Sequence, residues 1–442
     1  MTATSSPAED TPVFPSLRLG IAGLGTVGCG VIRQLQQQAP LLSSRAGRTL
    51  TVTAISARDR RKERGLDLKD FRWHDDPLDL VHDEEVDCIL ELIGGAEGTA
   101  RNLVETALRA GKPVITANKA LIALHGDHLT RLSQSTQTPL LFEASVAGGI
   151  PAIKLMREGL AGDTIKALGG ILNGTCNYIL STMEETGRDF DDVLKEAQES
   201  GFAEAEPSTD IDGWDTAHKL AILAGIACKP VIFDSLTVEG IRHITAHDLE
   251  FARKLGYRVK LLGMVRHHAK GDSVEAWVRP CLIARDTKLA HVNGVFNALT
   301  WEGTYSGPMT ISGRGAGEGP TATAVIADII DLARGNHLSL WGRVTKTEPV
   351  RTCPVEALHS SFYLRLLVDD TPGVIADISA VLRDQGVSVH LIAQHDATEQ
   401  RAYLTVITHP VANSAIINAA THLKALSSVH GAPLIITIES LS

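Results

Sequence analysis

The pattern of apolar and polar positions divides the chain into three parts, and the first part alternates strand and helix. Leu17–Ala22 is an apolar run typical of a buried strand, and Val31, Ile32 and Leu35 then recur at helical spacing. Further strands are expected at residues 50–56, 88–93, 113–116 and 140–143, with a helix at 99–110. Because strands that alternate with helices favour a parallel sheet, residues 17–145 are predicted to form one α/β domain.

The middle part, residues 146–341, is predicted to be an α+β domain. Strands are expected at 167–172, 259–265 and 276–284, the last two separated by a turn at Gly271-Asp272, and a helix is expected at 189–200. An amphipathic helix is predicted where apolar residues recur every three or four positions, at Trp214, Ala217, Leu220, Ala221 and Ala224. Gly307–Thr321 reads as a glycine-rich loop that opens a helix running to about Arg334.

The third part, residues 361–442, predicts a small domain of its own. Its strands and helices are expected at 362–368 (strand), 374–382 (helix), 387–393 and 402–407 (strands), 412–426 (helix) and 433–438 (strand). The order βαββαβ is typical of a ferredoxin-like sandwich. Residues 342–360, which contain Pro349 and Pro354, are predicted to be the linker that leads into it.

Composition and charge limit what the chain can bind. The 442 residues are 44% hydrophobic and 21% charged, as in soluble globular proteins, and carry a net charge of −10 without a basic tract. Nucleic acid and membranes are therefore not expected as partners, since no apolar run reaches the ~18 residues of a membrane span. Six scattered cysteines are typical of reduced thiols in the cytoplasm. Residues 1–16 read as a disordered tail, not as a signal peptide.

The first expected strand runs directly into a glycine motif, Gly23-Leu24-Gly25-Thr26-Val27-Gly28, and a helix follows. In such a motif one glycine makes the turn, one lets the backbone approach a pyrophosphate, and one lets helix and strand pack closely. The amide groups and dipole at the helix N-terminus favour the bound anion. Gly23, Gly25 and Gly28 therefore predict a dinucleotide-binding domain.

The end of the second expected strand bears on the choice between NAD and NADP. A site specific for NAD has an acidic residue here, but this chain has Ala57-Arg58-Asp59-Arg60-Arg61-Lys62. Arg58 and the cations after it favour a 2′-phosphate and hence NADP. A solvated basic loop is the alternative interpretation, and Asp59 keeps NAD open.

Two further candidates follow strands of the first domain. Lys119 stands at the carboxyl end of the strand at 113–116, where ligands lie in doubly wound sheets, although most lysines are only surface residues. Glu143–Pro151 leaves the last strand through a glycine pair and a proline, as a hinge between domains does. A carboxylate beside free backbone carbonyls suits a hard cation, and a plain turn is the alternative.

Residues 201–219 concentrate five carboxylates and one lysine. Asp215 and Lys219 are four positions apart on the predicted helix and therefore share a face, while Glu204 and Asp210 precede them in a turn. A solvated helix start with an ordinary ion pair would show the same spacing. The alternative hypothesis is an acid–base and substrate-binding site.

Taken together, these features resemble homoserine dehydrogenases with a C-terminal ACT domain, over nearly all of the chain after residue 16. The acidic stretch is the most specific motif, and it is matched by Ala197, Gly201, Phe202, Ala203, Pro207, Asp210, Ile211, Gly213, Asp215 and Lys219. The chain departs from the pattern at Glu206, where the family usually has Asp, Asn or Ser. The turn Asp369-Asp370-Thr371-Pro372-Gly373-Val374 resembles ACT domains, which commonly bind amino acids as effectors.

The resemblance assigns roles to individual residues. It implies that Lys219 is the proton donor, with Lys119 as the next candidate and Asp210 as a supporting acid, and that Glu204 and Asp215 bind substrate. It implies cofactor contacts at Thr26, Val27, Lys119, Gly201 and Gly315 or Gly317. It also implies a sodium ion at Glu143, Val146, Gly148 and Ile150.

The resemblance implies reversible reduction of L-aspartate 4-semialdehyde to L-homoserine with NAD(P)H, in threonine, methionine and isoleucine biosynthesis. It further implies an effector such as threonine and a homodimer or homotetramer. Two other functions stay open. Cys176, which follows a glycine turn, is the nucleophile that an aspartate-semialdehyde dehydrogenase would need. A sensor that binds a nucleotide and an amino acid without chemistry would have no need of a positioned proton donor.

Overall fold

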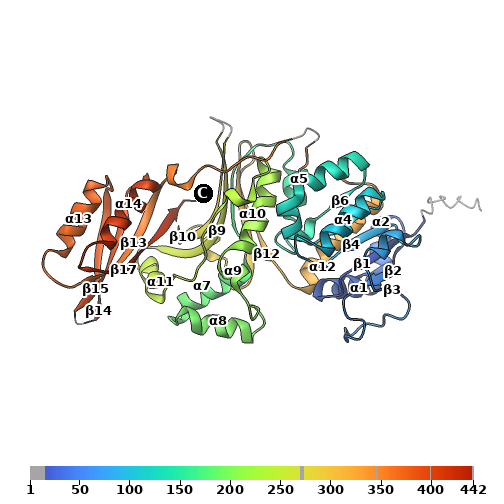
Figure 1. Ribbon diagram of the computed structural model, residues 1–442, viewed down its shortest axis with the longest axis horizontal. Helices are drawn as coiled ribbons and strands as arrows, with labels where there is room; N and C mark the ends of the chain where they lie inside the picture. The colour runs from blue at the N-terminus through green and yellow to red at the C-terminus, as the bar shows by residue number, and fades with distance from the viewer. Residues whose placement is uncertain (1–14, 269–272, 344–346, 399, 441–442) are drawn as a thin grey trace, which may run out of the picture. The chain divides into compact units, whose positions relative to one another are not determined.

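A computed structural model describes residues 15–268, 273–343, 347–398 and 400–440 (Figure 1). The described chain forms two compact units. The first holds the described residues of Met1–Gly149 and Gly317–Val344, and the second holds those of Ile150–Ala316 and Thr345–Ser442. The predicted turn at Gly271-Asp272 and residues 1–14 of the predicted tail lie outside the described residues. Within those residues, no helix is both long and apolar enough to cross a bilayer.

The first unit is built around a parallel sheet in the order β3-β2-β1-β4-β5-β6. Its strands are β1 (Leu17–Ala22), β2 (Leu50–Ser56), β3 (Arg72–His74), β4 (Cys88–Glu91), β5 (Val114–Thr116) and β6 (Leu140–Leu141). The strand order reverses beside β1, which pairs with both β2 and β4. This order confirms the predicted Rossmann-type domain, in which ligands bind at the carboxyl ends of the strands.

Helices connect these strands and bury apolar side chains against them. They are α1 (Thr26–Gln37), α2 (Ala39–Ala46), α3 (Asp79–His82), α4 (Thr99–Arg109), α5 (Lys119–Thr136) and the short turn η1 (Glu143–Ser145). The core of the unit lies along the central strands, where Leu19, Ile21 and Leu90 are fully buried. Burial on both faces explains why β1 and β4 read as continuous apolar runs.

One helix of the first unit comes from far along the chain. Helix α12 (Glu318–Arg334) packs on α1, and its apolar residues Ala322, Val325 and Ile329 belong to the core cluster of the first unit. The contact is close, because a side chain at Gly30 of α1 would meet Glu318 Cγ at 2.5 Å. The sequence analysis placed this helix in the middle domain. Local periodicity identifies a helix but does not show which core its apolar face joins.

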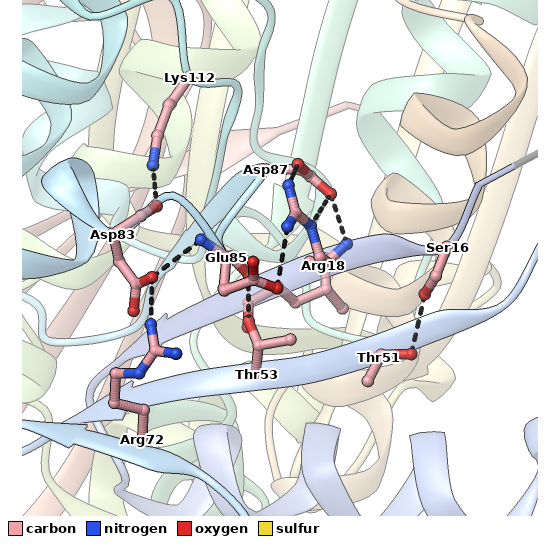
Figure 2. Close-up of polar contacts among 10 residues, drawn as sticks. Ser16, Arg18, Thr51, Thr53, Arg72, Asp83, Glu85, Asp87 and Lys112 are labelled. Carbon is pink, nitrogen blue, oxygen red and sulfur yellow. Dashed lines mark hydrogen bonds and ion pairs between the residues drawn. The ribbon is translucent and has the colours of Figure 1, made fainter.

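A polar network ties β1 to β4 at their amino ends, away from the glycine motif (Figure 2). Arg18 donates from Nε and Nη2 to the two carboxylate oxygens of Asp87, at 3.0 and 2.6 Å. Nearby, Lys112 Nζ donates to the Asp83 carbonyl at 2.6 Å. Burial alone would raise the pKa of Asp83, but hydrogen bonds from His74, the Glu85 amide and Arg72 hold this pKa at about 2. The network stabilises the end of the sheet opposite the expected ligand.

The second unit contains one continuous sheet in the order β12-β11-β7-β9-β10-β17-β13-β15-β14, with β8 beside β10 and β16 beside β13. Its strands are β7 (Ile165–Ile171), β8 (Thr237–Val238), β9 (Tyr257–His268), β10 (Ser273–Ala284), β11 (Phe296–Gly303), β12 (Gly307–Arg314), β13 (His359–Asp369), β14 (Val389–Thr398), β15 (Arg401–Thr408), β16 (Val411–Ala412) and β17 (Val429–Glu439). Its helices include α7 (Gly174–Thr186), α8 (Phe190–Glu199), α9 (Ser208–Ile211), α10 (Trp214–Ala227), α11 (Ala246–Lys254), α13 (Val374–Asp384) and α14 (Asn413–Lys424), and α6 (Ala152–Lys154) continues into the π-turn η2 (Leu155–Gly159).

Two expectations for the middle domain were wrong in part. Gly307–Arg314 is not a loop but the edge strand β12, which pairs antiparallel with β11. Gly307 and Gly313, near the two ends of the segment, suggested a loop, although the residues between them alternate as in a strand. Helix α10 packs on β9 and β10 and is buried on nearly all sides, so it is not amphipathic. The small residues that suggested an apolar stripe instead allow close packing around the helix.

The C-terminal part has the predicted βαββαβ order, with the strand order β17-β13-β15-β14 of a ferredoxin-like sheet and the extra short strand β16. It is not separated from the middle part by a free linker. Val350 and Thr352 of the predicted linker form bridges with Val231 and Val274. Strand β17 pairs parallel with β10 and so joins the two parts into one sheet.

Candidate active site

The glycine motif of the first unit leaves room for a ligand at one glycine and uses the others for packing. Gly23 has φ +106°, and a side chain there would meet Leu92 O at 2.4 Å. A side chain at Gly28 would meet Gly23 O at 2.1 Å, so this glycine lets α1 approach β1. At Gly25 a Cβ would meet no atom within 4 Å. Thr26 and Val27 form the first turn of α1, whose amide groups suit the diphosphate of a dinucleotide.

The basic loop after β2 lines a cavity of about 550 Å³, and its walls include Arg60, Arg61, Lys62, Arg64 and Trp73. The guanidinium of Arg60 lies 5.5 Å from the centre of the Trp73 ring. Arg64 has a structural role, because it donates to the carbonyls of Leu24, Lys62 and Asp59 and thereby ties the loop to the glycine motif. Arg58 is exposed and does not line this cavity. Cationic side chains such as those in its walls are the groups that bind phosphates.

Lys119 begins helix α5 directly after β5, as predicted, and is half-buried. Its position is set by a buried polar network. Thr116 Oγ1 donates to Glu91 Oε2 at 2.6 Å, and the Glu91 side chain is fully buried. Asn118 caps the helix by accepting from Leu121 N at 3.1 Å, and it donates to Gly95 O at 2.7 Å. The network joins the carboxyl ends of β4 and β5, the edge at which a Rossmann ligand lies.

In the second unit, Asp215 and Lys219 form a buried ion pair in the first two turns of α10. Lys219 Nζ lies 2.8 Å from Asp215 Oδ2 and donates to the carbonyl of Leu172 at 2.7 Å. The two side chains are only 11% and 6% exposed, for Lys219 and Asp215 respectively. The simple alternative of a solvated helix start is therefore wrong for this pair. A charged lysine held below the surface is suited to proton transfer.

Asn173, which the sequence analysis did not single out, joins the predicted carboxylates. Its side chain caps α7 by accepting from Cys176 N at 2.8 Å, and Nδ2 donates to Asp210 at 2.7 Å and to Asp215 at 2.8 Å. The structure thus brings Asp210, Asp215 and Lys219 together around one amide. The available signal was an Asn-Gly-Thr segment at a strand end, which is typical of a helix cap.

Cys176 is fully buried, and its thiol donates to the carbonyl of Asp210 at 3.2 Å. Burial, and next to it the charge of Asp210, raise the pKa of this thiol well above its ordinary value. Because a thiolate is the reactive form, Cys176 is not set up as a nucleophile. The geometry argues against the alternative of an aspartate-semialdehyde dehydrogenase.

Other predicted residues lie apart from this cluster or have a structural reason of their own. The Glu204 side chain is exposed, in the loop before α9. Gly201 has φ +73° and ends helix α8 in a left-handed conformation. Gly315 packs against Asn297, while Gly317, with φ +113°, caps α12 in the first unit.

The predicted cation loop contains one carboxylate and several backbone carbonyls. Glu143 is 2% exposed, and its amide donates to Asp328 Oδ2 at 2.8 Å. Val146 is buried, and the next two residues, Ala147 and Gly148, have φ of +56° and +53°. Ile150 is the first residue of the second unit. Among the described residues no cluster of three or more His, Cys, Asp or Glu side chains could hold a metal, so any ion here would depend on carbonyl oxygens, which suits a hard cation.

Three family models match successive parts of the chain. They are Homoserine dehydrogenase, NAD binding domain, over residues 23–143, Homoserine dehydrogenase over residues 151–330, and ACT domain over residues 362–427. The homoserine dehydrogenase of Pseudomonas aeruginosa is 42% identical over 438 residues, which cover 96% of this chain and 99% of that protein. That of Neisseria gonorrhoeae is 39% identical over 434 residues, with 96% and 99% covered.

Solved structures agree with these matches. The homoserine dehydrogenase from Thiobacillus denitrificans superposes with a TM-score of 0.90 at 39% identity, over 97% of this chain and 99% of that one. A hyperthermophilic archaeal homoserine dehydrogenase in complex with NADPH superposes with a TM-score of 0.62 at 27% identity, over 74% and 99%. The matches extend across both compact units and the ferredoxin-like part.

Proposed function

The chain belongs to the homoserine dehydrogenase family, and we propose that it interconverts L-aspartate 4-semialdehyde and L-homoserine through acid–base catalysis by Lys219. The buried Asp215–Lys219 pair is the observation that carries this assignment. Lys219 Nζ has three hydrogens, and two of its hydrogen bonds go to Asp215 and to the Leu172 carbonyl. The third N–H is the one that we assign to a substrate oxygen.

The residue types suit the charges that develop in the reaction. During reduction the aldehyde oxygen gains negative charge, and the Lys219 ammonium stabilises that charge and delivers a proton. In the reverse direction the neutral amine takes the hydroxyl proton of homoserine. The substrate also carries an α-ammonium, for which we assign Glu204 and Asp215 as carboxylate ligands and Asp210 as a supporting acid.

A bound nicotinamide cofactor supplies or accepts the hydride. We assign its diphosphate to Gly23, Gly25, Thr26, Val27 and Gly28, because the open space at Gly25 and the amides of α1 fit an anion. Lys119 is assigned a contact with the cofactor from the end of β5, and Gly201 and Gly315 or Gly317 are proposed as further contacts. Each of these glycines also has the structural reason described above.

We propose that NADP is the preferred cofactor. The loop after β2 holds Arg58, Arg60, Arg61 and Lys62, and a cation here pairs with a 2′-phosphate. Arg60, which lines the cavity beside Trp73, is the best-placed ligand, whereas Arg64 is committed to backbone carbonyls. The Asp59 carboxylate accepts from Arg61 N at 2.8 Å and is therefore engaged within the loop. Because a site specific for NAD needs a carboxylate for the ribose hydroxyl, this engagement favours NADP.

Further assignments complete the proposal. A sodium ion would be held by oxygens of Glu143, Val146, Gly148 and Ile150 and would order the loop that carries them. The ACT domain implies an amino-acid effector, and threonine is the one we propose. The active form is proposed to be a homodimer or homotetramer in the cytoplasm.

The test is to mix the purified protein with L-homoserine and NADP at alkaline pH and to follow the absorbance of the reduced cofactor. Reduction of NADP that is faster than reduction of NAD is expected, and added threonine should lower the rate. Absence of turnover with both cofactors, at protein concentrations that give measurable binding of NADP, would favour the sensor alternative.

A further inference from the structure

Asn297 lies in the second unit, beneath the Asp215–Lys219 pair, and none of the assigned roles uses it. It is the second residue of β11 and is 1% exposed. Its Nδ2 donates to the carbonyl of Leu172 at 2.9 Å. The same carbonyl accepts Lys219 Nζ at 2.7 Å. One backbone oxygen therefore accepts hydrogen bonds from both the buried Asn297 amide and the Lys219 ammonium.

The Asn297 side chain is closely confined. A Cβ on Gly315 would lie 2.1 Å from Asn297 Cγ, so the chain passes directly over the plane of the amide. Gly315 has a steric reason to be glycine that is independent of any cofactor. In the described chain, the buried Oδ1 of Asn297 has no hydrogen-bond partner. An unpaired buried acceptor costs about 1–3 kcal/mol, so stability alone does not explain an asparagine at this position.

The orientation of the Leu172 carbonyl affects the position of the Lys219 ammonium, which donates to it. Leu172 lies between the end of β7 and Asn173, the cap of α7 that also holds Asp210 and Asp215. The ammonium of Lys219 is located by two acceptors, Asp215 and this carbonyl. A rotation of the peptide plane at Leu172 would therefore move Lys219 Nζ and the cap together.

We propose that Asn297 is a positioning residue for the acid–base lysine. Its amide fixes the Leu172 carbonyl in the orientation that directs the remaining N–H of Lys219 toward the substrate. The inference rests on the proposed role of Lys219, and it adds a residue that touches neither substrate nor cofactor. A displacement of about 1 Å at a reacting group can lower a rate by about 100-fold, which sets the scale of the expected effect.

Two substitutions separate this role from a structural one. Asn297→Leu keeps the branching and the number of side-chain heavy atoms, removes the donor and also removes the unpaired Oδ1. We expect kcat for homoserine oxidation to fall by about 10- to 100-fold. The KM for the cofactor and the thermal midpoint of unfolding should stay close to the wild-type values.

Asn297→Asp introduces a carboxylate near the lysine. Because Asn297 Nδ2 and Lys219 Nζ bond the same oxygen, at 2.9 and 2.7 Å, they lie within about 6 Å of each other, where an opposite charge favours the ammonium. The pH at which homoserine oxidation reaches half its maximal rate should rise by about one unit. This shift would show that position 297 is electrostatically coupled to Lys219, whereas kcat of Asn297→Leu tests the positioning role itself.

Thr300→Val is the matched control. Thr300 lies on the same strand, is 5% exposed, and donates to the Met309 carbonyl at 3.0 Å, on the β12 side of β11. Its substitution should leave kcat and the pH profile unchanged. If Asn297→Leu turns over at the wild-type rate, or if Asn297→Asp has the pH profile of Thr300→Val, the inference is overturned. Turnover that survives Lys219→Met would instead remove the proposed role of Lys219.

Discussion

Replacement of Lys219 by methionine should abolish catalysis and also destabilise the second unit, and the structure shows how to separate the two effects. Methionine keeps an unbranched side chain that is one atom shorter, and it removes both hydrogen bonds of Nζ. Asp215, with a side chain only 6% exposed, would then lose the ammonium that Lys219 places against it. Breaking one side of a buried pair costs about 3–5 kcal/mol. The lower end is expected here, because Asn173 still donates to Asp215.

The double variant Asp215→Asn/Lys219→Met removes both charges. An amide at position 215 still accepts from Asn173, and the Leu172 carbonyl keeps its bond from Asn297. Replacing both members of a buried pair is often neutral for stability. The thermal midpoint of the double variant should therefore return toward that of the wild type, while its activity stays lost.

The assay is homoserine-dependent reduction of NADP, read beside thermal unfolding of the same samples. Lys219→Met should lower kcat by about 10²–10⁴-fold, the usual contribution of a general acid or base. Lys166→Met is the control, because Lys166 is a half-exposed lysine of the same unit, 3.7 Å from Glu302, and should change neither quantity measurably. If Lys219→Met keeps its turnover within about tenfold of the wild type, or if the double variant regains activity with stability, Lys219 is not the acid–base group.

Three further outcomes are expected. Cys176→Ala should keep its turnover within a few-fold of wild type, and a large loss of kcat would restore the nucleophile hypothesis. In the wild-type protein, thiol reagents should label Cys176 only after unfolding. Arg60→Ala should raise the KM for NADP by about tenfold or more, because one charge-assisted hydrogen bond is lost, and it should leave the KM for NAD unchanged. The control Arg109→Ala, at an exposed arginine, should change neither KM. For Asp83→Asn, the lowered pKa of Asp83 in the folded chain means that the carboxylate stabilises the fold above its ordinary pKa of 3.8. That advantage should disappear as the pH falls toward 2, so thermal midpoints of wild type and variant should converge in acid; a gap that is constant from pH 7 to pH 2 would contradict the assignment.

Local patterns in the sequence were sufficient to predict many of the strands and helices and the folds of two of the three parts. The apolar run of β1, the glycines after it and the helical spacing of α1 are adjacent in the chain, so they predicted the Rossmann-type domain correctly. The ferredoxin-like part was also predicted correctly, because its strands and helices follow one another directly in the chain. The docking of α12 on α1 and the pairing of β10 with β17 are contacts between distant segments, and periodicity carries no information about them.

In the candidate site, too, the local features could be predicted and the contacts between distant segments could not. Asp215 and Lys219 were found because an ion pair at i,i+4 is written into one helix. The other acceptor of Lys219 is the backbone carbonyl of Leu172, which any residue at that position would supply. Asn297 reaches this carbonyl from a strand far along the chain. Such support depends on the fold, so only the structure reveals it.

One continuous sheet in the second unit joins the candidate site to the ACT domain. Leu172 and Asn173 directly follow β7, and the sheet runs from β7 through β9 and β10 to β17 of the ACT domain. In the described part of the chain, three residue pairs join β10 to β17, fewer than join any other two neighbouring strands on this path.

Charged side chains are buried at that narrow junction. Arg266 of β9 lies between Glu275 of β10 and Glu439 of β17, and burial raises the pKa of Glu439 although Arg266 opposes the shift. Because removing one member of such a group is costly, the junction resists partial separation.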